Sequence, residues 1–111
     1  STVAAKLGMP FHASIATAKA GVEGLVKSLG AELASSIRIN AIAPTITDTT
    51  LASGILRNDR MKENMVERHP MKGYLQPEEV ANMADFLISE KAKSISGQTF
   101  EMDYGIVSFK I

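Results

Sequence analysis

The alternation of apolar and polar positions divides the 111-residue chain into helices and two short strands. Apolar residues recur at helical spacing over 14–34, which predicts one long helix. A second amphipathic helix is expected over 77–89, because Pro77 suits a first helical position and two glutamates follow it in the first turn. The β-branched run 37–43 predicts a buried strand, and 98–102 predicts a second strand.

The segments between these elements carry weaker signals. Residues 1–5 are small and partly β-branched, and they fit the end of a strand. Short helices are expected over 52–56 and 59–67, with Asp48 as the cap of the first one. His69 precedes a proline and is interpreted as a turn residue.

Strands that alternate with helices indicate an α/β fold with a parallel strand pair and a right-handed crossover. Two parallel strands do not make a self-sufficient sheet, because one edge and one face would remain bare. The pattern is therefore typical of one side of a larger, doubly wound parallel sheet, with three α/β/α layers in the intact protein.

The long helix carries a stripe of small residues beside its apolar face. Each glycine within a helix costs about 1 kcal/mol relative to alanine. A helix with such a stripe favours close approach of a second backbone, so another helix is expected to pack there. The stripe consists of Thr17, Gly21, Gly24 and Ser28.

Composition narrows the range of functions. Twelve basic and twelve acidic residues cancel, which argues against a nucleic-acid or membrane-surface partner. The chain has no cysteine, so a reducing compartment such as the cytoplasm is expected, and no apolar stretch is long enough for a membrane span. No metal site is expected. Ser1 is either a natural start after methionine removal or the edge of a truncation.

Five segments, in order along nearly the whole chain, resemble motifs of the short-chain dehydrogenases/reductases. Each motif alone is weak, but five in register are a strong signal. Residues 13–25 resemble the family's active-site helix, with Lys19 at the lysine position, and residues 38–44 resemble its sixth strand. Residues 44–49 resemble its Pro-Gly-x-x-x-Thr cofactor loop, with Thr45 in place of glycine. Residues 76–81 resemble the start of its last helix, and residues 96–105 resemble its last strand, which usually ends Asp-Gly-Gly.

The resemblance implies a role for each matching residue. Lys19 fits the lysine that bonds the nicotinamide ribose and favours ionisation of a catalytic tyrosine one turn earlier. Thr2 falls at the serine position and would hold the substrate carbonyl. The cofactor-loop positions are Pro44, Thr45, Ile46, Thr47 and Thr49.

The tyrosine position is the main departure from the family pattern. It holds Ile15, which cannot transfer a proton. A positioned acid or base contributes about 10²- to 10⁴-fold in rate. His12 and Ser14 flank the position, and either one is a possible replacement for the missing donor. Thr45 in place of glycine is expected to narrow the approach of the backbone to the cofactor.

By this resemblance, residues 1–111 form the C-terminal portion of a single NAD(P)-binding Rossmann-like domain whose N-terminal nucleotide-binding half is absent. The intact protein is expected to use NAD or NADP on a small carbonyl or alcohol substrate, as a homo-dimer or homo-tetramer, with catalysis impaired or altered by Ile15. The 111 residues alone are expected to be inactive. The alternatives are a non-catalytic binding or assembly subunit, or an inactive fragment.

Overall fold

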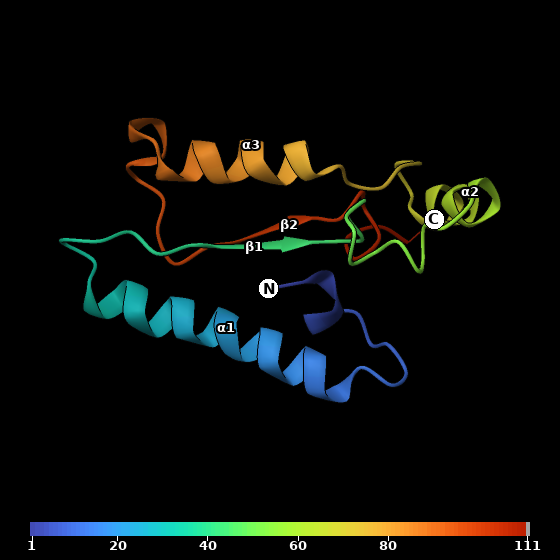
Figure 1. The fold of residues 1–111 in the computed structure, drawn as a ribbon. Helices are drawn as coiled ribbons and strands as arrows, with labels where there is room; N and C mark the ends of the chain where they lie inside the picture. Colours follow the sequence, from blue (N-terminus) through green and yellow to red (C-terminus); the bar gives the residue numbers. More distant parts are fainter. Residues whose placement is uncertain (111) are drawn as a thin grey trace.

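The computed structural model describes residues 1–110 and shows three layers (Figure 1). The middle layer is a pair of parallel strands, which confirms the predicted α/β class and strand direction. Helix α1 covers one face of the pair and helix α3 covers the other. The elements are a 3-10 turn η1 (Val3–Ala5), α1 (Ala13–Glu32), β1 (Ala41–Pro44), α2 (Asp59–Arg68), α3 (Pro77–Ile88), a 3-10 turn η2 (Glu90–Ala92) and β2 (Thr99–Met102).

Both strands are shorter than the sequence predicts. The ladder pairs Ala41 with Thr99 at one end and Pro44 with Met102 at the other. Before it, the Gly97 N–H still donates to the Ile39 carbonyl at 2.7 Å. The Asn40 side chain makes the other bonds there: its amide donates to the Ile95 carbonyl at 3.0 Å, and its oxygen accepts from the Gln98 N–H at 3.1 Å. These bonds compete with a regular ladder, so β1 begins at Ala41 instead of residue 37.

The first five residues follow the predicted strand only in part. The Ser1 nitrogen donates to the Ile42 carbonyl of β1 at 3.1 Å, and Thr2 has extended backbone angles. The chain then turns into η1, where the Ala5 N–H reaches the Thr2 carbonyl at 3.1 Å. The prediction of a strand over residues 1–5 is therefore wrong from Val3 onward.

The segment after β1 corrects two further expectations. Helix α2 agrees with the predicted 59–67, and Asn58 caps it by accepting the Met61 N–H at 2.9 Å. Residues 52–56 form irregular turns instead of a helix. The Thr49 hydroxyl, and not Asp48, accepts the Ala52 N–H there at 3.3 Å.

Helix α3 begins at Pro77, as the sequence predicts. The Glu79 carboxylate accepts the Gln76 N–H at 2.7 Å and so closes the first turn. At the other end, the Arg38 guanidinium donates to the carbonyls of Leu87 at 2.7 Å and Ala92 at 3.0 Å. Charged groups therefore satisfy both ends of this helix.

Helix α1 leaves much of its apolar surface uncovered. Val26 and Gly30 are its buried residues, and a Cβ added at Gly30 would lie 3.5 Å from the Gly97 Cα. A Cβ added at Gly21 or Gly24 would meet no atom within 4 Å among residues 1–110. Packing of the small stripe against another helix therefore stays a prediction. None of the helices in this described range is long and apolar enough to cross a membrane.

Candidate functional site

The candidate site lies at the carboxyl ends of the two strands, where ligands bind in open parallel sheets. The loop that follows β1 is held there by backbone bonds. The Thr45 N–H donates to the Met102 carbonyl at 2.9 Å. The Leu75 N–H reaches the Ile46 carbonyl at 3.1 Å, and the Asp48 N–H reaches the Leu75 carbonyl at 2.8 Å. Leu75 thus extends the sheet beyond β1 and fixes the loop conformation.

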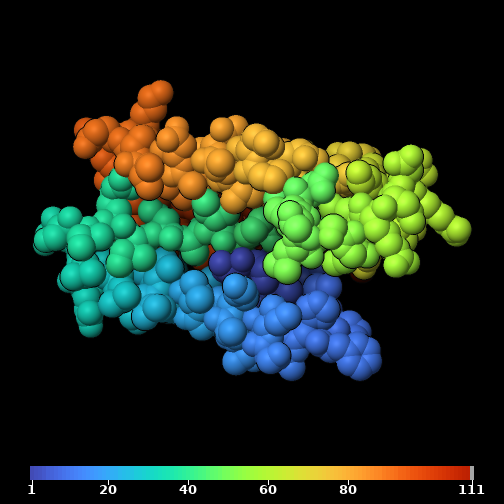
Figure 2. Space-filling model, viewed as in Figure 1, coloured from blue at the N-terminus to red at the C-terminus, as the bar shows by residue number. Residues whose placement is uncertain are grey.

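A cavity of about 470 Å³ opens beside this loop. Figure 2 shows its surroundings, with the N-terminal residues in dark blue between α1 and the green segment that follows β1. The cavity brings together most of the residues that the sequence predicts for the site. Its lining includes Thr2, His12, Ile15, Ile46, Thr47 and Thr49.

Thr2 is half-buried at the cavity wall. Its hydroxyl donates to the Pro44 carbonyl at 3.2 Å. The oxygen of Thr2 can still accept a hydrogen bond, but its single proton is engaged. To hold a substrate carbonyl, the hydroxyl would have to rotate away from Pro44.

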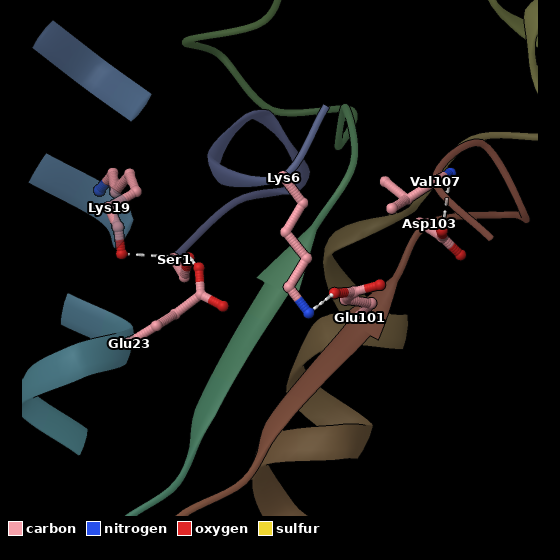
Figure 3. A network of polar contacts seen from close by, with 7 residues as sticks. All are labelled: Ser1, Lys6, Lys19, Glu23, Glu101, Asp103 and Val107. Carbon is pink, nitrogen blue, oxygen red and sulfur yellow. Dashed lines mark hydrogen bonds and ion pairs between the residues drawn. The ribbon is translucent and has the colours of Figure 1, made fainter. Parts of the chain in front are cut away.

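Lys19 lies at the margin of the site. It is exposed on α1, one turn after Ile15, and it is not part of the cavity lining. Its backbone carbonyl lies 3.4 Å from the Ser1 hydroxyl, which contacts the Glu23 carboxylate more closely at 2.6 Å (Figure 3). The fold therefore anchors the backbone at Lys19 and leaves its ammonium group at the surface.

The two possible replacements for the tyrosine differ in position. Ile15 itself lines the cavity and is 49% exposed. His12 also lines the cavity, whereas Ser14 does not. The Nδ1 atom of His12 lies 2.7 Å from the Pro10 carbonyl and must donate to it, since a carbonyl only accepts. In the neutral ring, Nε2 of His12 is then an acceptor, whereas in the protonated ring it carries a proton as well.

Thr45 points away from this cavity. Its side chain is 8% exposed, and its hydroxyl lies 2.8 Å from Nε2 of His69. The lining of the 470 Å³ cavity does not include Thr45. The Thr45 side chain is directed toward His69. The expected narrowing of the backbone's approach to the cofactor stays a prediction.

His69 is a buried residue that the sequence did not indicate. It follows the last residue of α2 and begins a turn, in which the Lys72 N–H donates to its carbonyl at 2.9 Å, so the predicted turn position is confirmed. Its side chain is nevertheless buried, with the residue 2% exposed. Its Nδ1 atom lies 2.6 Å from the Met65 carbonyl, one turn earlier. A histidine before a proline carries no local signal for such burial, because its partner Thr45 is 24 residues away.

A second cavity of about 370 Å³ adjoins the first. The two share apolar walls, and the second one reaches α2. Its polar residues are Thr45, Arg68 and His69, and the walls common to both cavities are Val3, Met9, Ile46 and Ile55.

Two charged contacts hold the surroundings of the site (Figure 3). Lys6, at the end of η1, pairs with Glu101 of β2, and the hydrogen bond that its ammonium group donates to this carboxylate raises the pKa of Lys6. Burial opposes ionisation of Asp103, but backbone N–H groups, including those of Gly105 at 2.9 Å and Val107 at 3.0 Å, outweigh it and lower the pKa of this carboxyl. These contacts fix η1 and the turn after β2.

No group of three or more histidine or acidic side chains in residues 1–110 is arranged to hold a metal ion.

Comparison with known proteins gives matches over nearly the full chain. The family model described as "Enoyl-(Acyl carrier protein) reductase" matches residues 1–107. The 3-oxoacyl-[acyl-carrier-protein] reductase FabG of Staphylococcus aureus (strain Mu50) is 38% identical over 107 residues, which are 96% of this chain and 43% of that protein. The 3-oxoacyl-[acyl-carrier-protein] reductase of Synechocystis sp. is 38% identical over 111 residues, or 98% and 43%. The chain thus spans less than half the length of these relatives.

Solved structures also superimpose on nearly the full chain. A 4-hydroxyisoleucine dehydrogenase complexed with NADH superimposes with a TM-score of 0.90 at 25% identity, over 99% of this chain and 46% of that one. A gluconate 5-dehydrogenase from Burkholderia cenocepacia, in complex with NADP and tartrate, gives 0.88 at 28% identity, over 98% and 43%.

Proposed function

Since this chain belongs to the short-chain dehydrogenase/reductase family, we propose that residues 1–111 are the C-terminal portion of an NAD(P)-binding Rossmann-like domain. The complete protein is then an oxidoreductase that acts on a small carbonyl or alcohol substrate. One observation carries this proposal. Thr2, the cofactor-loop residues Ile46, Thr47 and Thr49, and the tyrosine position Ile15 all line one cavity.

The residues present fit a nicotinamide cofactor. The cavity of about 470 Å³ is within the usual range for small-molecule sites. The N–H of Ile46 makes no hydrogen bond within residues 1–110, so it is available to an amide or phosphate oxygen. The Thr49 hydroxyl accepts a backbone N–H at 3.3 Å and keeps its own proton for donation. When bound, the nicotinamide supplies or accepts the hydride.

The remaining chemistry falls to the residues of the chain. The Thr2 hydroxyl, turned from Pro44, donates to the substrate oxygen and polarises the carbonyl. By the family resemblance, the Lys19 ammonium group would bond the nicotinamide ribose. Its positive charge would also stabilise the negative charge that develops on the substrate oxygen. Ile15 supplies no proton, so catalysis is slower than with a tyrosine or uses another donor, such as the protonated form of His12 at the same cavity.

The substrate class follows from the names of the relatives. A 3-oxoacyl reductase, a hydroxyisoleucine dehydrogenase and a gluconate 5-dehydrogenase share only a carbonyl or alcohol group in those names. This shared group defines the proposed substrate.

A second candidate is a non-catalytic binding or assembly subunit of the same family. Ile15 at the tyrosine position favours it, as does the exposed apolar surface of α1. In that case α1 serves as an interface between copies of the protein in a homo-dimer or homo-tetramer.

Titration of the protein in its natural full length with NADH and NADPH, followed by fluorescence, separates the two candidates. An oxidoreductase is expected to bind one of them at micromolar concentration, and Thr49→Val is expected to weaken binding. Thr50→Val, at the exposed neighbouring position, is the matched control and should bind as the wild type does. Absence of binding at high micromolar cofactor would reject the oxidoreductase and favour the assembly subunit.

A further inference from the structure

Two departures from the family motifs meet at one buried residue. Thr45 replaces the glycine of the cofactor loop, and Tyr104 replaces a glycine of the final Asp-Gly-Gly. The Thr45 hydroxyl lies 2.8 Å from Nε2 of His69. The rings of His69 and Tyr104 meet edge to face, with centroids 6.3 Å apart. The two substituted positions are 59 residues apart in sequence, and His69 contacts both.

The hydrogen bonds define which atoms carry protons. Nδ1 of His69 lies 2.6 Å from the Met65 carbonyl and must donate to it. In the neutral ring, Nε2 is then an acceptor, so the Thr45 hydroxyl donates to it. Both residues are buried, at 2% exposure for His69 and 8% for Thr45, although both also line the 370 Å³ cavity.

The ring of His69 is itself held from the other side. The Tyr104 hydroxyl donates to the Glu79 carboxylate in the first turn of α3 at 2.9 Å. The Tyr104 carbonyl accepts the Met71 N–H at 3.0 Å. Gly73 leaves room for the phenol, since a Cβ there would lie 2.4 Å from it. The imidazole therefore has one fixed position between α2 and the turn after β2.

We propose that His69 is a positioning residue for the cofactor loop. By accepting the Thr45 hydroxyl, it turns this side chain away from the 470 Å³ cavity and keeps the backbone of 45–49 open on the cofactor side. Without the acceptor, the buried Thr45 hydroxyl would lack a partner and would seek one by moving the loop. This role rests on the proposed function, because it requires that the loop bind NAD(P).

The test compares cofactor affinity with folding stability in the full-length protein. Thr45→Val keeps the volume and removes the donor, and it is expected to weaken NADH or NADPH binding about tenfold. Thr45→Ser keeps the hydroxyl and should bind within about threefold of the wild type. His69→Gln keeps an acceptor for the Thr45 hydroxyl and should also bind the cofactor within about threefold of the wild type. This variant tests the role even if one variant at position 45 fails to fold. Thr50→Val is the exposed control.

The outcomes distinguish the two levels of the proposal. Weaker binding by Thr45→Val with retention by Thr45→Ser and His69→Gln supports the positioning role. If the wild type binds and Thr45→Val lowers the unfolding temperature with unchanged affinity, His69 is only structural and this inference is overturned. If the wild type binds neither cofactor, the proposed function fails, and the role of His69 fails with it.

Discussion

At the scale of single residues, the site combines a retained hydroxyl with a missing phenol. Thr2 and Ile15 line the same cavity, but Thr2 has its proton engaged by Pro44, and Ile15 has none to give. His12 is the histidine of this cavity, with Nε2 left as an acceptor. Whether proton transfer limits the reaction is therefore testable at position 15.

Ile15→Tyr restores a hydroxyl at the family position. Because a positioned acid or base contributes about 10²- to 10⁴-fold, carbonyl reduction by the full-length protein is expected to rise by at least about tenfold. Steady-state rates with NADH or NADPH over a panel of carbonyl compounds measure this gain. Ile15→Phe supplies the ring without the hydroxyl and is expected to show no gain. Equal turnover in all three proteins would mean that another group already supplies the proton.

The ionised carboxylate of Asp103 is expected to stabilise the folded chain. Its pKa in the folded chain lies below the usual 3.8, because backbone N–H groups bind the carboxylate and outweigh the effect of its burial. The resulting stability is fully present above the unfolded pKa and is lost as pH falls through the lower folded pKa. Asp103→Asn loses one acceptor and is expected to cost about 2 kcal/mol near pH 7.

Urea denaturation of wild type and Asp103→Asn, at neutral pH and at successive steps below pH 4, measures this dependence. The two midpoints are expected to converge at the acid end, where the carboxyl is protonated in both states. A constant difference across this pH range would contradict the role of the charge.

At the scale of elements, backbone ends are satisfied by side chains from distant segments. Arg38, which precedes β1, donates to the carbonyls of Leu87, Ser89 and Ala92 at the end of α3. This bond set joins one helix to the entry of the central strand pair. It also covers carbonyls that the helix itself leaves without partners.

Arg38→Lys is expected to destabilise the protein by about 2 kcal/mol, because an ammonium group cannot reproduce the forked geometry of three donations. Thermal or urea unfolding of the full-length protein measures the change. Arg57→Lys, at an exposed position, is the matched control and should change stability by less than about 0.5 kcal/mol. Equal effects of the two substitutions would show that the carbonyl contacts contribute little.

At the scale of the whole molecule, the chain is extended and its apolar surface is only partly covered. Its radius of gyration is 15.2 Å, whereas a domain of this length averages about 13 Å. Large apolar side chains on α1 are exposed, including Ile15, Val22 and Leu25. Such a surface is typical of a helix that packs against further structure.

Gly24→Leu tests whether that further structure is a second copy at the small stripe. The position is open within the chain, so leucine is tolerated there and even favours the helix by about 0.8 kcal/mol. If α1 packs against its mate in a homo-oligomer, the added side chain is expected to shift the full-length protein toward monomers in sedimentation velocity. Gly54→Leu, at another open glycine, is the control. An unchanged oligomer with higher thermal stability would place the interface elsewhere.

Sequence patterns were enough to predict the helices around Lys19 and after Pro77, the parallel direction of the strands and the order of the motifs. The helices depend on short-range properties, namely helical spacing and first-turn residues, and the strand direction follows from the helix that connects the two strands. The family resemblance named Thr2, Ile46, Thr47 and Thr49 as site residues, and these four line one cavity, while their roles stay predictions.

The tertiary structure alone decided the start of β1, the direction of Thr45 and the burial of His69. Asn40 shortens the strand through bonds to residues 95 and 98, and Thr45 turns toward a histidine 24 residues away. In each case a polar side chain could form hydrogen bonds of similar strength with several different partners. Which bond forms depends on which distant segments the fold brings within about 3 Å of the side chain, and the local sequence does not indicate those segments.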